Sequence, residues 1–501
     1  MTDGTGASSY QYDSLHRLTK SKNGAGNQVS YGYDLRGDLT GLTYPSGKQV
    51  TRGLDGIGRL TSVRDWLGNT SNFHYDADGN PIETDYGNGV SGAFGYDQTD
   101  LVVAMDYTSG RQTFLGFDYT RDSLGLVSSD TSGQAGDANY SYTSINQLSA
   151  DNHSPFAFDP ADDMVQLNKA SLTYDLANEL VNQSGGFGVA SSLLYDPRGN
   201  RIQQTGLLGP QTYHYDQANR LIAFGAHATY AYNGDGLRSR KVVNGASEPF
   251  AWDLAQGLPL LLSDGTSQFI YGPKGRPLEQ VSANGAVLWF HQDQLGSTRA
   301  LTDSRGNTAA RYGFSAYGQR PGDDPGDNGS IAITPLLFAG QYTDAESGLQ
   351  YLRARYYDPS TGQFLTRDPL VAATAVISGA PMNPYAYAGD NPLAFSDPSG
   401  LCGPQVPQFT MPPSPPMRHH TGGQQAQAAQ QAIDQAIIEQ ALEEVLDGAS
   451  EDWEGSEGTG TTGPTPPGAI EPAALPPTPP EPTFPQNSPT NIPLGNGTET
   501  A

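Results

Sequence analysis

The sequence predicts an all-β protein made of repeated hairpins, and three observations favour this fold class. Gly (61) and Pro (37) make up about a fifth of the 501 residues, and only 36% are hydrophobic, which suits many strands and turns better than a helical bundle. The aromatic residues are mostly Tyr, 27 against 4 Trp, as expected for half-buried sheet surfaces with one wet edge. The third observation is a repeat of fixed period, which indicates an architecture of stacked units.

The repeated unit reads aromatic-x-Tyr-Asp-x-x-Gly-Arg-Leu-Thr. Its copies include YQYDSLHRLT, YGYDLRGDLT, FHYDADGN, LLYDPRGNRI and YHYDQANRL. Four successive steps of 21 residues separate the positions that precede the Asp, which are Tyr12, Tyr33, Leu54, Tyr75 and Tyr96. The unit recurs with looser spacing at Tyr174, Tyr195, Tyr215 and Tyr232.

Each copy is expected to form a β-hairpin. The aromatic-x-Tyr alternation places both rings on one face of a strand. The Asp carboxylate can then accept backbone N–H groups in the turn, where the Gly supplies the positive φ. A single hairpin cannot bury its aromatic face, so neighbouring copies are expected to stack into a continuous sheet. We therefore assign the repeated Tyr, Asp and Gly to architecture and give none of them a catalytic role.

Charge and cysteine content disfavour several classes of function. The 53 acidic and 27 basic residues give a formal charge of −26, so a nucleic-acid surface or an anionic membrane is a poor partner for the shell. The single cysteine, Cys402, excludes an internal disulfide framework. No apolar run is long enough to span a membrane, and the N-terminus lacks the pattern of a signal peptide.

From about residue 286 the loose repeats give way to a distinctive block. It contains HQDQLGSTRALTD, YLRARYYDPSTGQFLTRDP and NPYAYAGDNPLAFSDPSGL. Its Asp-Pro pairs begin at Asp358, Asp368 and Asp397, and on residue chemistry alone each could be an ordinary turn. They are also carboxylates, and peptide hydrolysis without a metal or a nucleophilic side chain needs one carboxylate to take a proton from water and another to give one to the carbonyl or the leaving nitrogen. Two carboxylates close enough to share a proton supply both roles.

The repeats and this block resemble those of bacterial RHS/YD-repeat proteins and of the C components of insecticidal toxin complexes, over roughly residues 10 to 400. The resemblance implies a sheet that spirals into a hollow or partial shell around the C-terminal segment. It also implies that the block, an RHS-associated core, acts as an aspartyl-type protease on its own chain only. In the family the cut follows the Leu of a terminal DPxGL.

Carried over by position, the family's catalytic residues are Arg355, Asp368 and Asp397, and the scissile bond joins Leu401 to Cys402. In this assignment the arginine orients one carboxylate. The two aspartates lie 29 residues apart, and the connection VAATAVISGAPM is slightly longer than the family pattern. We therefore expect a different loop geometry rather than a different chemistry.

Three segments follow from these patterns. Residues 1–285 are the repeat shell, 286–401 the RHS-associated core, and 402–501 a variable segment. The last segment holds 18 of the 37 prolines and 12 acidic residues against one basic residue, so most of it is expected to be disordered. An amphipathic helix is predicted at about 424–447, and no pattern of a folded catalytic toxin is visible there.

The remaining candidates carry less weight. His291 and Asp293 are too few to form a metal site, and Arg418-His419-His420 has no second group of ligands. Cys402 has no His or Asn partner that would make it a nucleophile. Asp358, the nearest rival to Asp368, is assigned to the turn of YYDPSTG. We predict neither a cofactor nor a metal.

The leading hypothesis is a self-cleaving shell that encloses residues 402–501 as the cargo of a toxin or effector. The resemblance implies synthesis in the cytoplasm without a signal peptide, delivery by a dedicated export system, and partnership with a secretion apparatus or an upstream toxin-complex component. One alternative is a non-enzymatic surface or carbohydrate-binding module. Another is a truncated, inactive remnant. Cleavage of the purified chain distinguishes the first hypothesis from the other two.

Overall fold

The computed structural model describes residues 2–132, 136–152, 154–185, 190–206, 209–320, 332–370 and 383–401. The chain divides into two units, residues 1–442 and 443–501, and all described residues belong to the first. Within them the regular structure consists of β-strands and three single-turn 3₁₀ helices, so the predicted all-β class is confirmed. The predicted helix at 424–447 and the rest of the variable segment lie outside the described residues.

A small hairpin and one long antiparallel meander make up the first part of the chain, and each strand of the meander pairs with the next. These strands are β1 (Thr2–Asp3), β2 (Gly6–Ala7), β3 (Ser9–Tyr12), β4 (Leu18–Lys22), β5 (Gln28–Tyr33), β6 (Leu39–Thr43), β7 (Gln49–Leu54), β8 (Leu60–Arg64), β9 (Thr70–Tyr75), β10 (Pro81–Asp85), β11 (Val90–Tyr96), β12 (Val102–Ser109), β13 (Gln112–Arg121), β14 (Val127–Ser132), β15 (Gly136–Tyr142), β16 (Leu148–Asp151), β17 (Ser154–Phe158), β18 (Met164–Leu167), β19 (Ala170–Tyr174), β20 (Leu180–Gly185), β21 (Ser191–Tyr195), β22 (Arg201–Gly206), β23 (Gly209–Tyr215), β24 (Leu221–Phe224), β25 (Ala228–Tyr232), β26 (Arg238–Val243) and β27 (Ala246–Pro249).

Two smaller antiparallel sheets follow. The first has seven strands: β28 (Ala251–Asp253), β29 (Leu260–Ser263), β30 (Ser267–Tyr271), β31 (Pro277–Ser282), β32 (Val287–Gln292), β33 (Thr298–Thr302) and β34 (Thr308–Arg311). The second has four: β35 (Tyr342–Thr343), β36 (Gln350–Leu352), β37 (Arg355–Asp358) and β38 (Gln363–Phe364). The 3₁₀ turns are η1 (Pro273–Gly275), η2 (Phe338–Gly340) and η3 (Ala388–Asp390). The predicted boundary after residue 285 falls inside the seven-stranded sheet, between β31 and β32.

The repeated unit forms the hairpin that its sequence predicts. In the second copy, Oδ1 of Asp34 accepts the backbone N–H groups of Arg36, Gly37 and Asp38 at 2.9–3.0 Å. Gly37 has φ 97°, which side chains with a Cβ rarely adopt. The hydroxyl of Tyr33 donates to the carbonyl of Leu18, which lies in the preceding hairpin, at 2.7 Å. The Tyr-Asp pair therefore closes its own turn and ties it to the previous copy.

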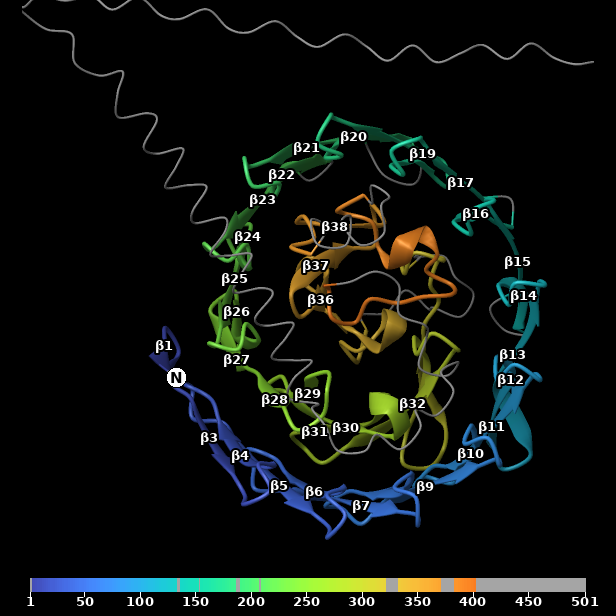
Figure 1. Cartoon of the computed structure of the whole chain (residues 1–501), viewed down its shortest axis with the longest axis vertical. Coiled ribbons are helices and arrows are strands. Elements are labelled where there is room, and N and C mark those ends of the chain that lie inside the picture. Colours follow the sequence, from blue (N-terminus) through green and yellow to red (C-terminus); the bar gives the residue numbers. More distant parts are fainter. Residues whose placement is uncertain are drawn as a thin grey trace, which may run out of the picture. The chain divides into compact units, whose positions relative to one another are not determined.

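A register shift accompanies the Tyr of the unit in copy after copy, for example between Gly32 and Tyr33 and between Gly95 and Tyr96. Such β-bulges increase the local twist of a sheet. Repeated along the meander, they bend it into the curved outer wall seen in Figure 1.

The outer sheet is open, because within the described residues no strand register joins β27 to β3. Its two ends meet through side chains instead. The hydroxyl of Tyr10 donates to Oδ2 of Asp235 at 2.5 Å, and Nδ2 of Asn23 donates to the carbonyl of Phe250 at 3.3 Å. From there the chain passes inward, with β28 in contact with β5, and the later strands lie inside the outer ones in Figure 1. The sheet is therefore a spiral, as predicted, and its two ends overlap.

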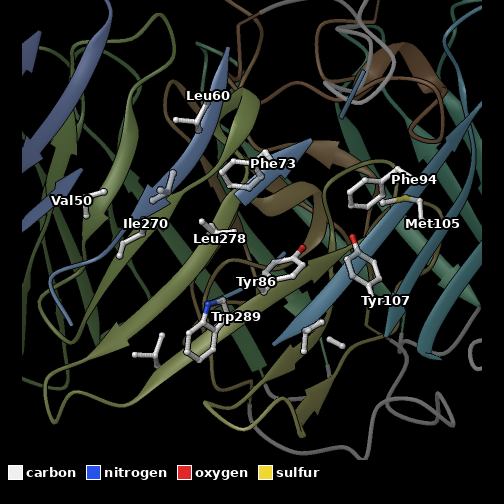
Figure 2. Close-up of a cluster of buried hydrophobic side chains, with 14 of the residues drawn as sticks. Val50, Leu60, Phe73, Tyr86, Phe94, Met105, Tyr107, Ile270, Leu278 and Trp289 are labelled. Atoms are coloured by element: carbon white, nitrogen blue, oxygen red, sulfur yellow. The ribbon is translucent and has the colours of Figure 1, made fainter. Parts of the chain in front are cut away.

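The inner seven-stranded sheet packs its apolar face against the outer sheet. Figure 2 shows Ile270, Leu278 and Trp289 of the inner strands beside Phe73 and Tyr107 of the outer strands, all buried. Tyr hydroxyl groups cross the same interface. Tyr107 donates to the carbonyl of Gln292 at 2.8 Å, for instance. The predicted aromatic face of the repeats thus forms the main hydrophobic core.

The four-stranded sheet is held to outer strands by two buried ion pairs. Nη1 of Arg201 lies 2.6 Å from Oδ2 of Asp358, and Nη1 of Arg238 lies 2.5 Å from Oδ2 of Asp344. Aromatic and aliphatic side chains from the outer strands β23 to β26 pack around the same sheet. These contacts fix the segment that carries the candidate site.

Candidate functional site

The first residue of β37, Arg355, is the centre of the site. Its guanidinium group is buried, with the side chain 3% exposed, and its Cζ lies 3.6 Å from the ring centroid of Phe364 on β38. Nη1 donates to the carbonyl of Pro384 at 3.1 Å, and Nε donates to the carbonyl of Gly400. The ring of Phe364 and the two carbonyl groups together hold the plane of the guanidinium group in one orientation.

Asp368 lies four residues beyond β38 and reaches the guanidinium group from one side. Its backbone N–H donates to the carbonyl of Pro384 at 2.9 Å, and its Oδ1 accepts the N–H of Leu370 at 2.8 Å. Its Oδ2 lies 2.8 Å from Nη2 of Arg355. The Asp368 side chain remains 12% exposed, so this carboxylate keeps some access to solvent.

Asp397 opens the turn formed by DPSGL and is almost completely buried, at 1% exposure. Its Oδ1 accepts the N–H of Gly400 at 2.8 Å, the N–H of Leu401 at 3.3 Å and the hydroxyl of Ser399 at 2.9 Å. Its Oδ2 lies 3.3 Å from the same Nη2 of Arg355. The local Asx turn therefore aims one oxygen at the end of the motif and the other at the arginine.

Burial raises the pKa of Asp397 above its ordinary value of 3.8, because removal from water penalises the carboxylate. The charge of Arg355 and the hydrogen bonds from Ser399 and Gly400 oppose this rise, and the neighbouring carboxylate of Asp368 adds to it. The two acids thus sit in different surroundings, one dry and one partly wet. This is the asymmetry that separates an acid from a base in a carboxylate pair.

The structure thus brings together the three side chains that the resemblance picked out, although they are spread over residues 355–397. Both carboxylates contact the same guanidinium nitrogen, Nη2, so Arg355 bridges the two acids that are predicted to share a proton. The amide of Leu401, one residue before the predicted scissile bond, is within hydrogen-bond distance of Asp397. Cys402 lies outside the described residues. The catalytic roles stay predictions.

Two partners of the site were missed from the sequence, Phe364 and Pro384. Neither carries a catalytic group, and each acts through its ring face or its carbonyl oxygen. Backbone carbonyls have no signature in a sequence, and the ring contact depends on the pairing of β37 with β38.

The weaker candidates have structural surroundings. His291 is fully buried among Tyr86, Tyr107 and Phe114, its Nε2 lies 2.8 Å from the hydroxyl of Thr302, and burial lowers the pKa of its imidazole to about 3. No group of three or more potential metal ligands occurs among the described residues. None of the helices found there could cross a membrane.

Asp293 and Asp358 both begin turns. Oδ1 of Asp293 accepts the N–H of Leu295 and that of Ser297, while Oδ1 of Asp358 accepts the N–H of Ser360 and its Oδ2 pairs with buried Arg201. Arg418-His419-His420 lies outside the described residues.

Two family models match the chain. The model described as Teneurin YD-shell covers residues 263–393, and the RHS Repeat model covers residues 33–70. These matches confirm the predicted resemblance to RHS/YD-repeat proteins and agree with the spiral of repeated hairpins.

Several of its curated relatives are toxins or nucleases. The tRNA3(Ser)-specific nuclease WapA of Bacillus spizizenii is 32% identical over 42% of this chain and 9% of its own length. Toxin protein Tse5 of Pseudomonas aeruginosa is 30% identical over 46% and 19%, and Double-stranded DNA deaminase toxin A of Burkholderia cenocepacia is 26% identical over 50% and 21%. The chain thus spans less than a quarter of the length of these relatives.

Solved structures share the fold. A crystal structure of TcdB2-TccC3 superposes with a TM-score of 0.58 at 16% identity, covering 78% of this chain and 24% of that one. The Photorhabdus luminescens Tc holotoxin pore gives a TM-score of 0.57 at 18% identity, covering 77% and 22%.

Proposed function

We propose that this protein is the self-cleaving shell of an RHS-type toxin or effector and that it hydrolyses its own Leu401–Cys402 bond. One observation carries the proposal: a single buried guanidinium group, that of Arg355, contacts Asp368, Asp397 and the carbonyl of Gly400 at once. Two carboxylates and the end of the DPSGL motif are thereby held in one place, although they are far apart in the sequence.

In the proposed reaction, Asp368 is the base and Asp397 the acid. Asp368 takes a proton from a water molecule, whose oxygen adds to the carbonyl carbon of Leu401. Asp397, whose raised pKa favours its protonated form, donates its proton toward the carbonyl oxygen as the tetrahedral intermediate forms. Collapse breaks the C–N bond. Asp368 gives the proton that it took from water to the nitrogen of Cys402, and Asp397 takes back a hydroxyl proton as the carboxyl group forms. The products are a new carboxyl group at Leu401 and a new amino group at Cys402.

Arg355 has two roles in this scheme. Its guanidinium group lies 2.8 Å from Oδ2 of Asp368 and orients that carboxylate, and its bond to the carbonyl of Gly400 keeps the reacting strand end in reach. Lysine has one donor centre in place of a planar fork, so Arg355→Lys cannot make all of these contacts.

The test is the fate of the full chain after synthesis. We expect cell-free synthesis to give a full-length band that converts to two fragments, residues 1–401 and 402–501, with the smaller one beginning Cys-Gly-Pro on N-terminal sequencing. Asp368→Asn and Asp397→Asn should each leave one intact band. Asp303→Asn alters a partly exposed turn aspartate of the same block and should leave cleavage unchanged. A wild-type chain that stays intact under all conditions would remove the proposal.

We further propose that the shell encloses residues 402–501 until delivery, with an export apparatus or an upstream toxin-complex component as partner. Support comes from the overlapping ends of the outer sheet and from the packing of the four-stranded sheet inside it. The relatives whose names describe nucleases, a deaminase and a toxin point in the same direction.

A further inference from the structure

The turn between β36 and β37 makes hydrogen bonds to three successive carbonyl groups of the DPSGL motif. Nη1 of Arg353 donates to the carbonyl of Pro398 at 2.6 Å, the backbone N–H of Ala354 donates to that of Ser399 at 3.1 Å, and Nε of Arg355 donates to that of Gly400. Three adjacent residues thus hold three adjacent carbonyls directly upstream of Leu401. We call residues 353–355 the carbonyl clamp.

Arg353 is built into the clamp at a conformational cost. Its φ of 65° lies in the left-handed region, which side chains other than glycine rarely adopt. The guanidinium group is also anchored away from the motif, by Nε to the carbonyl of Pro259 at 2.9 Å and by Nη1 to Oε1 of Gln341 at 2.8 Å. The inner sheet therefore fixes the donor that reaches Pro398.

Gly400 fits the clamp because it has no side chain. A Cβ at this position would lie 2.6 Å from the carbonyl oxygen of Leu352 and 2.9 Å from the backbone nitrogen of Arg355, and φ is +70°. Both neighbouring atoms belong to the backbone, so neither can give way cheaply. The clamp thus accepts glycine at the residue that precedes Leu401.

We propose that the carbonyl clamp sets the register of self-cleavage, with Arg353 as a positioning residue and Gly400 as the residue that the clamp selects. This inference rests on the proposed function. The hydrogen bonds of the Arg353 side chain go to carbonyl and amide oxygens, so it acts by holding the strand that carries the bond. Hydrogen bonds to backbone carbonyls do not depend on which side chains the bound strand carries. The requirement for glycine at position 400 therefore makes the clamp selective for one register of the strand.

The matched control for Arg353 is Arg276. Its guanidinium group lines the same cavity as Arg353 and also donates to two backbone carbonyls, those of Asp293 at 3.1 Å and Gln294 at 2.7 Å, neither of which belongs to the DPSGL motif. We expect Arg353→Lys to slow self-cleavage by between about tenfold and about a hundredfold, because small losses of alignment reduce such reactions strongly. Arg276→Lys should leave the rate within about twofold of the wild type.

The matched control for Gly400 is Gly348, which has φ +73° and no neighbouring atom within 4 Å of the place that a Cβ would take. Gly348→Ala therefore adds backbone strain alone, whereas Gly400→Ala adds strain and a backbone clash. We expect Gly400→Ala to abolish cleavage or to move it to another bond, and Gly348→Ala to cut normally at Leu401. Intact mass and N-terminal sequencing of the fragments identify the bond that is cut.

Cell-free synthesis of the full chain, with a time course at several pH values and a thermal melt of each product, separates the outcomes. A positioning residue lowers the rate by the same factor at every pH, so the shape of the pH profile should be that of the wild type, and thermal stability should match that of Arg276→Lys. Wild-type rates in Arg353→Lys, or normal cutting in Gly400→Ala, would overturn the clamp while leaving the proposed function standing. Failure of the wild-type chain to cut would overturn both.

Discussion

At the scale of single residues, the surroundings of an acid group decide what it can do. Asp397 is dry, bonded to the backbone amides of its own turn and shifted toward its protonated form, whereas Asp368 keeps an exposed edge. The same comparison applies to carboxyl groups far from the site. Burial raises the pKa of Asp390 and of Glu279 to about 8, and that of Asp130 to about 7. The buried carboxyl groups outside the site should affect the stability of the fold, whereas Asp397 should affect the rate of cleavage.

The first prediction concerns the pH dependence of cleavage. If protonated Asp397 is the acid, the rate is lost as pH rises through its raised pKa, because the donor proton is then gone. The measurement is the initial rate of conversion from mildly acidic to alkaline pH after cell-free synthesis. A rate that climbs steadily with pH would contradict the assignment of Asp397 as the acid.

The second prediction concerns Glu279, a fully buried carboxyl group on β31. Its folded pKa of about 8 exceeds its ordinary 4.5, so the folded state binds more protons and the wild type loses stability as pH rises between these values. Glu279→Gln removes this loss. We expect it to raise the unfolding free energy at pH 8 by on the order of 3 kcal/mol relative to the wild type, and to change it little at pH 4.

Urea unfolding of both proteins across this pH range measures the difference. Glu83→Gln on β10 is the control, because Glu83 is exposed. An equal gain in both variants, or a gain for Glu279→Gln that is greatest at low pH, would refute the argument from burial.

At the scale of elements, the repeated hairpin is stabilised by a small recurring set of contacts. In the copy that begins at Asp55, Arg59 pairs with Asp55 at 2.7 Å and its Cζ lies 4.8 Å from the ring centroid of Tyr75. The hydroxyl of Tyr75 donates to the carbonyl of Leu60 at 2.7 Å. The same Asp, Arg and Tyr geometry occurs around Asp13, where the partner ring is Tyr33.

The third prediction is that Tyr75→Phe lowers the unfolding free energy by about 1 kcal/mol, the usual net value of one such hydrogen bond. Tyr12→Phe is the comparison, because the Tyr12 side chain is 59% exposed, and its effect should be close to zero. Equilibrium unfolding in urea measures both. Equal effects would mean that the hydroxyl groups do not tie neighbouring hairpins together.

The fourth prediction concerns the connection between the outer strand β26 and the four-stranded sheet. Arg238 and Asp344 are both fully buried, and Cζ of Arg238 lies 4.4 Å from the ring centroid of Phe250 and 4.5 Å from that of Tyr351. Asp344→Asn leaves a buried guanidinium group without its counter-charge, which costs about 3–5 kcal/mol.

Lys241 also pairs with Asp344, at 3.2 Å, and its second partner Glu248 lies 3.4 Å away and is 27% exposed. The control for this prediction is therefore Glu248→Gln. Its loss should be much smaller, because solvent screens a pair of this kind. Thermal unfolding of the two variants side by side is the measurement. A smaller loss in Asp344→Asn than in Glu248→Gln would show that the connection is not ionic.

At the scale of the whole molecule, the sequence foretold the repeated part better than the parts that meet across space. The 21-residue period and the Asp turns predicted hairpins stacked into a continuous sheet, because both depend on residues close together in the chain. The spiral was predicted from the family resemblance alone. The overlap of Tyr10 with Asp235 could not be predicted, since it depends on the bend added by many successive bulges.

The site shows the same division. The three catalytic candidates came from a resemblance, and residue chemistry alone left the Asp-Pro pairs as turns. The role of Arg353 was invisible in LRARYYDP, where strand alternation would give Arg353 and Arg355 the same face. The turn at Arg353, with φ 65°, breaks that alternation and sends the two guanidinium groups to different carbonyls.

The last prediction tests whether the shell retains its cargo. Leu401, the C-terminus that the proposed cut would create, is tied to Asp397 in a turn that residues 353–355 hold against the four-stranded sheet within the outer wall. If residues 402–501 are enclosed there, cleavage does not by itself let the smaller fragment out of the shell. Both fragments should then leave a size-exclusion column together under native conditions and separately in denaturant. The smaller fragment should also resist added protease, whereas a synthetic peptide of residues 402–501 should be digested quickly. The proposed enclosure would be contradicted if the smaller fragment eluted alone from the native column and was digested as fast as the free peptide. Self-cleavage would then stand without a cargo chamber.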